Sequence, residues 1–146
     1  MTMRVSIVEK DFNYKGFRCK VVFQQLGHRC GYVEIPKGHE LFEKDYEDID
    51  VQVHGGLTYA NHYVAPEGET ENWWIGFDCA HYMDGRDYET AYKLYKDHPE
   101  VLSSLKYMEK VDKMFDTNVG EVRTMEYVEG ELKSIVDQII GGYNND

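Results

Sequence analysis

The first half of the chain carries the alternation of apolar and polar positions that is typical of β-strands. This alternation predicts strands over Arg4–Val8, Phe17–Leu26, Cys30–Ile35 and Asp50–His54. A turn at Gly27-His28 joins the second and third of these, and the fourth resumes at Leu57–Tyr59 after Gly55-Gly56. Trp73–Cys79 is the most apolar segment, so we expect it to form the central strand, preceded by a polar loop over Pro66–Asn72.

The second half changes to the spacing of three and four residues that amphipathic helices show. Helices are predicted over Tyr88–Lys96, from Pro99 onward, and from Val122 to Ile139, with Asn118 and Glu121 as a capping box and Gly141-Gly142 as a C-cap. Strands followed by helices predict an α+β fold, in which C-terminal helices pack on an antiparallel sheet built from the N-terminal half. We expect residues 1–146 to form a single domain.

Charge and cysteine content exclude several classes of function. The net charge is −11, which excludes a generally basic nucleic-acid binder, so no direct binding to nucleic acid is expected. The acidic residues concentrate in Glu40–Asp50, which is interpreted as a solvated loop. No apolar run approaches the roughly 20 residues that span a bilayer, so no membrane association is expected. Three widely spaced cysteines form no disulfide framework, which favours a cytoplasmic location.

Residues able to carry chemistry gather between positions 36 and 86, next to the predicted strand ends. His54 ends one strand, and Asp78, Cys79 and His81 end another, so neighbouring strands would bring them together. The cluster permits a metal site of His54, His81 and either Asp78 or Cys79, or a Cys79/His81 nucleophile pair. A buried, inert Cys79 with Asp78 and His81 bonded to turn backbone explains the same residues, so no catalytic residue, metal ligand or cofactor is assigned.

Binding without chemistry is the remaining interpretation of this region. The Gly55-Gly56 backbone could hold an anion, Tyr59 and Trp74 offer flat faces for a base, and Lys37, His39 and Arg86 could pair with phosphate. The predicted ligand-binding residues are therefore Lys37, His39, His54, Gly55, Gly56, Thr58, Tyr59, Trp74, Asp78, His81 and Arg86.

The strings GYVEIPKGHELFEKDYEDIDVQVHGGLTYA, WWIGFDCAH and VRTMEYVEGELKSIVDQI resemble a family of small proteins common in bacteriophages and prophages. The resemblance covers about Phe17 to Asp84 and the final helix. It implies that residues 88–117 are a helical insertion, and that the protein acts in the host cytosol if a phage encodes it. It carries no established activity.

Phage context favours a protein that acts on host defence. We expect a protein that sequesters a small anionic signalling nucleotide without cleaving it. The alternatives are a metal- or Cys/His-dependent hydrolase of a similar ligand, and an acidic protein-binding inhibitor that imitates DNA. A homo-oligomer is also expected, because the apolar stripe of the last helix and the tyrosines Tyr88, Tyr92 and Tyr95 offer surfaces to a second copy.

Overall fold

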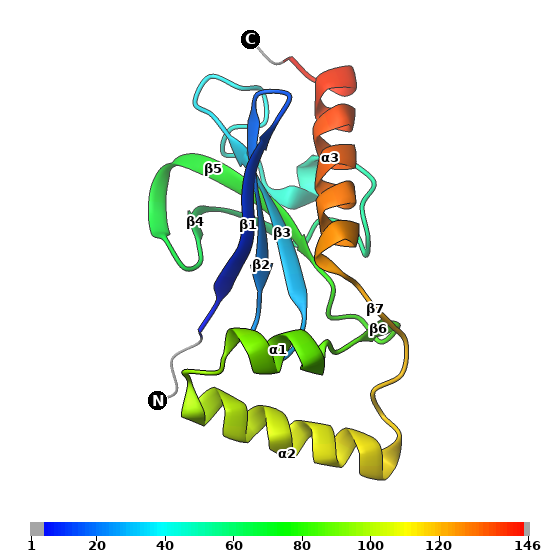
Figure 1. Cartoon of the computed structure of the whole chain (residues 1–146). Helices are drawn as coiled ribbons and strands as arrows, with labels where there is room; N and C mark the ends of the chain where they lie inside the picture. Colours follow the sequence, from blue (N-terminus) through cyan, green and yellow to red (C-terminus); the bar gives the residue numbers. More distant parts are fainter. Residues whose placement is uncertain (1–4, 145–146) are drawn as a thin grey trace.

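The computed structural model describes residues 5–144 and confirms the α+β class (Figure 1). Five antiparallel strands form the main sheet in the order β1-β2-β3-β5-β4. Their bounds are β1 Ile7–Tyr14, β2 Phe17–Phe23, β3 Arg29–Ile35, β5 Gly68–Asp78 and β4 Tyr59–Val64. The helices are α1 Tyr88–Leu94, α2 Pro99–Phe115 and α3 Met125–Gly142, with a short 3-10 turn at Tyr46–Asp48. A small parallel pair, β6 Asp84–Gly85 and β7 Glu121–Val122, lies below the lower end of α3, near α1 (Figure 1).

One face of the sheet is covered by α3, and the main core lies between them. The predicted helical spacing places five apolar side chains of α3 against the sheet, all of them buried: Val128, Leu132, Ile135, Val136 and Ile139. They meet alternate residues of β2, β3 and β5, such as Val21, Val33 and Ile75. Gly31 allows this close approach, because a Cβ there would lie 2.6 Å from the Phe77 ring and 3.0 Å from Leu132.

The opposite face of the sheet is partly covered by the β4–β5 hairpin, which curls over it (Figure 1). Glu67, at the hairpin tip, forms an ion pair with the buried Lys20 of β2 and another with Arg18 at 3.1 Å. Val64 packs with Val22 and Trp74 beneath the hairpin. The rest of this face, on the side of the β2–β3 turn, has no helix over it.

The helices α1 and α2 lie within residues 88–117 and cross the lower end of the sheet (Figure 1). That this segment is an insertion stays a prediction. Tyr95 anchors them, since its fully buried hydroxyl donates to the backbone oxygens of Val5 at 2.6 Å and Phe23 at 3.2 Å. The side chain of Asp87 caps α1 by accepting from the backbone N–H of Thr90. Pro99 begins α2 at the position where its missing N–H costs nothing.

The strand predicted over Asp50–His54 is wrong, although the alternation that suggested it is real. This segment is extended but has no strand partner, and alternate backbone N–H groups donate instead to side chains of α3. Asp50 bonds Tyr143 at 2.7 Å, Gln52 bonds Gln138 at 2.7 Å and His54 bonds Glu131 at 2.9 Å. Val51 and Val53 point to the core between them. The segment is therefore hydrogen-bonded along α3 rather than paired within the sheet.

Several predicted boundaries also differ from the structure. β3, rather than the strand through Trp73–Cys79, is central, and the predicted loop Pro66–Asn72 forms part of the β4–β5 hairpin. Of the predicted strand Arg4–Val8, Arg4 lies outside the described residues, and β1 continues to Tyr14. α3 begins at Met125 with Thr124 as its cap, and it includes Gly141 and Gly142. Asn118 caps no helix, because its side chain accepts from the N–H of Arg86.

Both surfaces that suggested an oligomer are used within one chain. The apolar stripe of α3 is buried on the sheet. Tyr88 and Tyr95, at the two ends of α1, are buried in the cluster that α1 and α2 form with Phe23. Tyr92 is partly buried and donates to Glu109 at 2.8 Å. The oligomeric state stays a prediction, but these residues no longer support it. Within residues 5–144, no helix combines the length and apolar character that a membrane span requires.

We predict that Gly31→Ala lowers the free energy of unfolding by about 1–3 kcal/mol, the usual cost of overpacking a core. The added methyl must displace the Phe77 ring or push Leu132 and α3 away from the sheet. Gly130→Ala is the matched control, because its Cβ on α3 meets nothing within 4 Å. Urea unfolding followed by circular dichroism measures both variants. Equal stability of the two would show that α3 does not depend on close contact at Gly31.

Candidate functional site

The sheet divides the predicted ligand-binding residues into separate groups. Lys37 and His39 follow Ile35 at one end of β3, whereas Asp78 pairs with Cys30 at the other end. His39 is buried, with its Nδ1 accepting from the N–H of Leu41 and its ring against Phe17. Seven residues of β3 separate the groups by roughly 20 Å. The phosphate-binding role predicted for Lys37 and His39 therefore does not fit a site at His54 and Asp78.

Trp74 is a core residue, so its predicted role as an exposed stacking surface is wrong. Its side chain is fully buried beneath the β4–β5 hairpin, where its indole N–H donates to Thr70 at 3.0 Å. The Lys20 ammonium lies 5.3 Å from the centre of its ring. A ligand could reach this ring only if the hairpin lifted.

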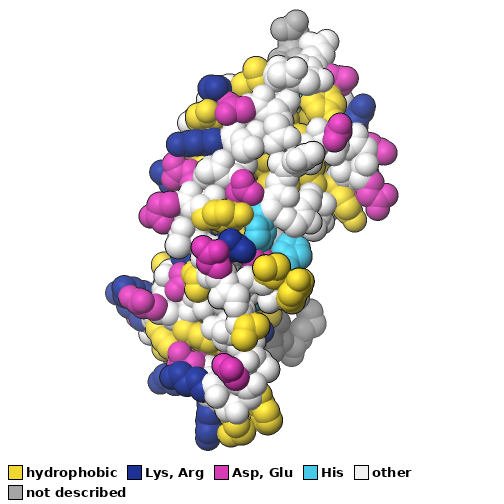
Figure 2. Space-filling model, turned by 90° about the vertical axis from the view of Figure 1, so that its right-hand side faces the viewer, with side chains coloured by type: hydrophobic (Ala, Val, Ile, Leu, Met, Phe, Trp, Pro, Cys, Tyr) yellow, Lys and Arg dark blue, Asp and Glu magenta, His cyan; other side chains and the backbone are white. Residues whose placement is uncertain are grey.

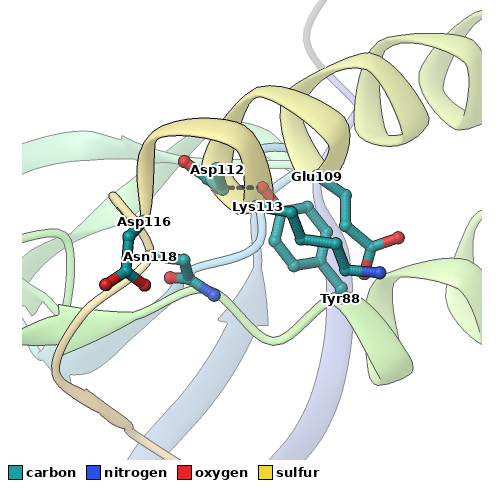
Figure 3. Close-up of a pocket in the computed structure, with 6 residues that line it drawn as sticks. All are labelled: Tyr88, Glu109, Asp112, Lys113, Asp116 and Asn118. Carbon is teal, nitrogen blue, oxygen red and sulfur yellow. Dashed lines mark hydrogen bonds between the residues drawn. The ribbon is translucent and has the colours of Figure 1, made fainter.

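Arg86 lies beside a small polar pocket of about 210 Å³ near the end of α2 (Figure 3). Its guanidinium already has partners, since it donates to the backbone oxygen of Leu26 at 2.8 Å and lies 3.5 Å from Asp112. Asp112 also accepts from the Tyr88 hydroxyl in that pocket. The carboxylates that line the pocket, from Glu109, Asp112 and Asp116, oppose an anionic ligand there.

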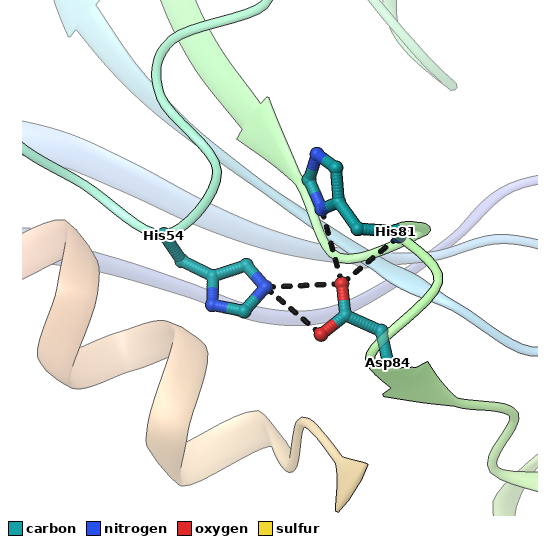
Figure 4. Close-up of side chains that lie close together, drawn as sticks. All are labelled: His54, His81 and Asp84. Atoms are coloured by element: carbon teal, nitrogen blue, oxygen red, sulfur yellow. Dashed lines mark hydrogen bonds and ion pairs between the residues drawn. The ribbon is translucent and has the colours of Figure 1, made fainter. Parts of the chain in front are cut away.

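His54, His81 and Asp84 form a compact cluster where β5 ends, and their ring nitrogens and carboxylate converge (Figure 4). Nε2 of His54 lies 2.9 Å from Oδ1 and 3.0 Å from Oδ2 of Asp84. Nδ1 of His81 lies 3.1 Å from Oδ2, and the backbone N–H of His81 donates to the same oxygen at 3.0 Å. Figure 2 shows histidine side chains at the surface, near the narrow middle of the molecule.

Glycine and a tight turn bring these three residues together. Gly55 has φ +68°, and a Cβ there would lie 2.3 Å from the His81 ring, so only glycine lets the ring lie against this turn. The turn after His54 is closed by a 2.8 Å bond from the N–H of Gly56 to Val53. In a second turn, the backbone N–H of Asp84 donates to the backbone oxygen of His81, and this turn places the Asp84 carboxylate next to the His81 ring.

Asp84 is the ionised centre of the cluster. Burial alone would raise its pKa, but hydrogen bonds from His54, His81 and Arg123 outweigh burial and hold the pKa well below its usual range. The guanidinium Nε of Arg123 donates to Oδ1 at 2.9 Å, and the Asp84 side chain is fully buried. The sequence prediction included His54 and His81 but missed Asp84 and Arg123. The string AHYMDGRD contains a sequence signal for Asp84, because Asp-Gly marks a turn and a turn can bring the Asp carboxylate close to a preceding His.

Cys79 does not belong to the cluster as a nucleophile. Its side chain is 1% exposed within the main core, and burial raises the pKa of its thiol to about 12. A thiolate is the reactive form of cysteine, so this burial removes the support for a Cys79/His81 pair. The interpretation of Cys79 as a core thiol is the one that its surroundings favour.

A second hollow, of about 570 Å³, opens on the sheet face that α3 does not cover. Gly76 of β5 lies in register between Tyr32 of β3 and Tyr59 of β4. Because Gly76 has no side chain, the two tyrosine rings meet edge to face, with centroids 5.3 Å apart. Tyr63 and Ala65 of the hairpin form one wall. A glycine inside an apolar strand is the sequence signal that could have indicated this hollow. We call it the tyrosine pocket.

The far wall of the tyrosine pocket is the β2–β3 turn, which supplies Gln24, Gln25, Leu26 and His28. Nδ1 of His28 is buried and has no hydrogen-bond partner among the described residues. Burial, with the positive charge of Arg86 nearby, lowers the pKa of His28, so the ring is neutral at pH 7. A buried polar atom without a partner is uncommon, and a water molecule is the simplest partner for it.

Asp78 lies between the tyrosine pocket and the histidine cluster. It lines the pocket, and its Oδ2 accepts from the Thr58 hydroxyl at 3.0 Å. Its Oδ1 accepts from the N–H of Ala80 at 3.0 Å and lies 3.9 Å from Nε2 of His81. Of the predicted residues, the structure thus brings together His54, Gly55, Gly56, Thr58, Asp78 and His81, with Tyr59 close by in the pocket.

Comparison with protein-family models, curated proteins and solved structures finds no match to this chain. The resemblance to phage and prophage proteins therefore stays an expectation, and function has to be argued from the residues themselves.

We predict that Trp74→Ala lowers the free energy of unfolding by about 3–5 kcal/mol, because it empties a fully buried site. Tyr107→Ala is the control, since Tyr107 on α2 is 71% exposed and its loss should change stability by less than about 0.5 kcal/mol. Chemical denaturation followed by circular dichroism measures both. A Trp74→Ala variant as stable as the control would return this ring to the set of accessible binding residues.

We also predict that Cys19 and Cys79 resist iodoacetamide at pH 8 in the native chain. Both thiols are buried, and with a pKa of about 12 only about one in ten thousand is a thiolate at that pH. Cys30 is only partly buried, at the wall of the tyrosine pocket, and should react first. Mass spectrometry of digested protein locates the label. Rapid labelling of Cys79 before unfolding would restore the thiol nucleophile as an alternative.

Proposed function

We propose that this protein binds a small molecule through a flat aromatic ring held in the tyrosine pocket, without chemical change to the ligand. The observation that carries this proposal is an open hollow whose lining is mostly apolar and includes Tyr32, Tyr59 and Tyr63. Small-molecule sites are mostly apolar hollows with a few convergent polar groups, and the tyrosine pocket has this composition.

The pocket supplies two kinds of recognition to a planar ring. The perpendicular rings of Tyr32 and Tyr59 form a corner, against which one ring can pack by face and by edge. Asp78 supplies a polar contact through a carboxylate that accepts hydrogen bonds, and Gln24 and Gln25 add side-chain amides to the lining. A nucleobase carries donor and acceptor groups around a flat ring and fits this combination.

Charge decides which part of a nucleotide the pocket favours. Within the described residues, none that line the pocket is Lys or Arg, and Asp78 adds negative charge. A phosphate inside the pocket would be repelled, so the base or nucleoside enters and any phosphate lies outside. In a phage protein, such a ligand would be a nucleotide signal of host defence, which the protein would sequester.

Sequestration is favoured over hydrolysis because the pocket holds no activated nucleophile among the described residues. Cys30 is the thiol at its wall, and burial raises the pKa of Cys30. Incubating the protein with nucleosides, nucleotides and cyclic dinucleotides, then denaturing it and analysing the released material, tests both points. Intact released ligand supports the proposal, whereas altered ligand, or no depletion by any candidate, contradicts it.

We predict that Tyr59→Ala weakens the binding of any ligand that the protein removes from solution in this experiment. The expected loss of affinity is about ten- to hundredfold, the usual contribution of one stacked aromatic ring. Tyr107→Ala removes an exposed tyrosine of α2 that does not line the pocket, and it should bind as the unmodified chain does. Isothermal titration calorimetry gives both affinities. Equal weakening in both variants, or in neither, would show that the ligand lies elsewhere.

A further inference from the structure

We propose that His54, His81 and Asp84 bind one divalent transition-metal ion, with Zn²⁺ as the best fit. This proposal is independent of the ligand in the tyrosine pocket. The metal site considered from the sequence contained His54 and His81 with Asp78 or Cys79. The structure gives a different third ligand, because Asp84 lies under both rings and Cys79 is sealed in the core.

The three ligand atoms are already close to the separation that an ion requires. Ligands at 2.0–2.2 Å from an ion, in tetrahedral geometry, lie about 3.3–3.6 Å from one another. Nε2 of His54 and Nδ1 of His81 lie 3.0 and 3.1 Å from Oδ2 of Asp84, and all three atoms are within 4.8 Å of one another. The two ring-to-carboxylate separations therefore need to lengthen by only a few tenths of an ångström to admit an ion.

Four nitrogens surround the Asp84 carboxylate: the backbone N–H of His81, one ring nitrogen each of His54 and His81, and Nε of Arg123. An ionised carboxylate has about four lone-pair sites, so it can accept from all of them, and an ion would take the place of the two ring nitrogens. With an ion bound to both rings, Oδ2 would contact the ion and keep only the backbone N–H.

Two of the three ligands also have an outer partner of the kind that metal sites use. Nδ1 of His54 lies 2.9 Å from the hydroxyl of Tyr127, which can accept a hydrogen bond from Nδ1–H when Nε2 binds an ion. Oδ1 of Asp84 accepts from Arg123 at 2.9 Å, whereas Nε2 of His81 lies 3.9 Å from Asp78, beyond hydrogen-bond distance.

The donor set selects the class of ion. Two imidazoles and one carboxylate suit Zn²⁺ and neighbouring transition metals, whereas Ca²⁺ and Mg²⁺ prefer oxygen ligands alone. Three protein ligands leave a fourth position to water or to an anionic group. The His81 side chain is 36% exposed, so an ion can enter from solvent.

The test uses the full chain after treatment with a chelator, titrated with Zn²⁺ by calorimetry and with Co²⁺ by visible absorption. We expect one equivalent of Zn²⁺ per chain with micromolar or tighter affinity. Co²⁺ should give the strong d–d bands of a four- or five-coordinate site with nitrogen ligands. Either no saturable binding below millimolar Zn²⁺, or a Co²⁺ spectrum like that of the hexaaqua ion, would overturn the proposal.

Three variants separate this site from adventitious binding. His81→Ala should weaken Zn²⁺ binding at least hundredfold, and Tyr127→Phe about tenfold, because the latter removes only an outer partner. His62→Ala is the matched control, since Nε2 of His62 lies 3.0 Å from the Glu43 carboxylate but has no second histidine on it. Its affinity should be unchanged.

Circular dichroism first confirms that each variant is folded, and His81→Gln replaces His81→Ala if the latter is not. Tyr127 is 36% exposed, so Tyr127→Phe tests the site with little risk to the core. Zn²⁺ binding that survives the loss of His81, or that weakens equally in His62→Ala, would overturn the assignment of these three ligands.

Discussion

The burial of one ionised carboxylate, that of Asp84, constrains the whole lower end of the sheet. A buried charge is tolerated only when it is paired and hydrogen-bonded, and removing one partner typically costs about 3–5 kcal/mol. The partners of Asp84 come from three separate places: His54 from the segment fastened along α3, His81 from its own turn, and Arg123 from the residues just before α3. The entry to α3 is thus positioned by electrostatics as well as by its apolar stripe.

A second buried ion, Arg29, extends this constraint to the helices α1 and α2. Its guanidinium pairs with Glu9 of β1 at 2.6 Å and with Asp87 at the start of α1 at 2.9 Å, and it donates to the backbone oxygen of Arg123. The β6–β7 pair brings the chain segments on either side of residues 88–117 side by side. The helices α1 and α2 are held there by Arg29 and, farther along, by the Tyr95 hydroxyl on the backbone of Val5 and Phe23.

Local patterns of the sequence predicted those parts of the fold that local physics determines. The turn at Gly27-His28 and the strands on either side of it, the helix that begins at Pro99, and the stripe of α3 depend on spacing and on capping residues, and they are present. Asp50–His54 shows the limit of this method. Alternation reports that every second side chain is buried, but it does not report whether the backbone partner is a strand or, as here, the side chains of a helix. Asp84 was missed because two of its partners, His54 and Arg123, are 30 and 39 residues away.

The same limit applies to the candidate site. The sequence indicated which residues could carry chemistry, but not which of them lie close together. His54, Asp78 and His81 meet because β5 ends beside the His54 turn, whereas Lys37 and His39 lie at the other end of β3. Asp78 then lies between the tyrosine pocket and the histidine cluster. One of its oxygens faces His81, and the other is held by Thr58 at the rim of the tyrosine pocket. An ion bound to Nδ1 of His81 would place the ring proton on Nε2, the nitrogen that lies toward Asp78. This proton would change the hydrogen bonds that the Asp78 carboxylate can offer to a ligand in the tyrosine pocket. The metal and the ligand, although proposed on separate evidence, would therefore be coupled through a single carboxylate.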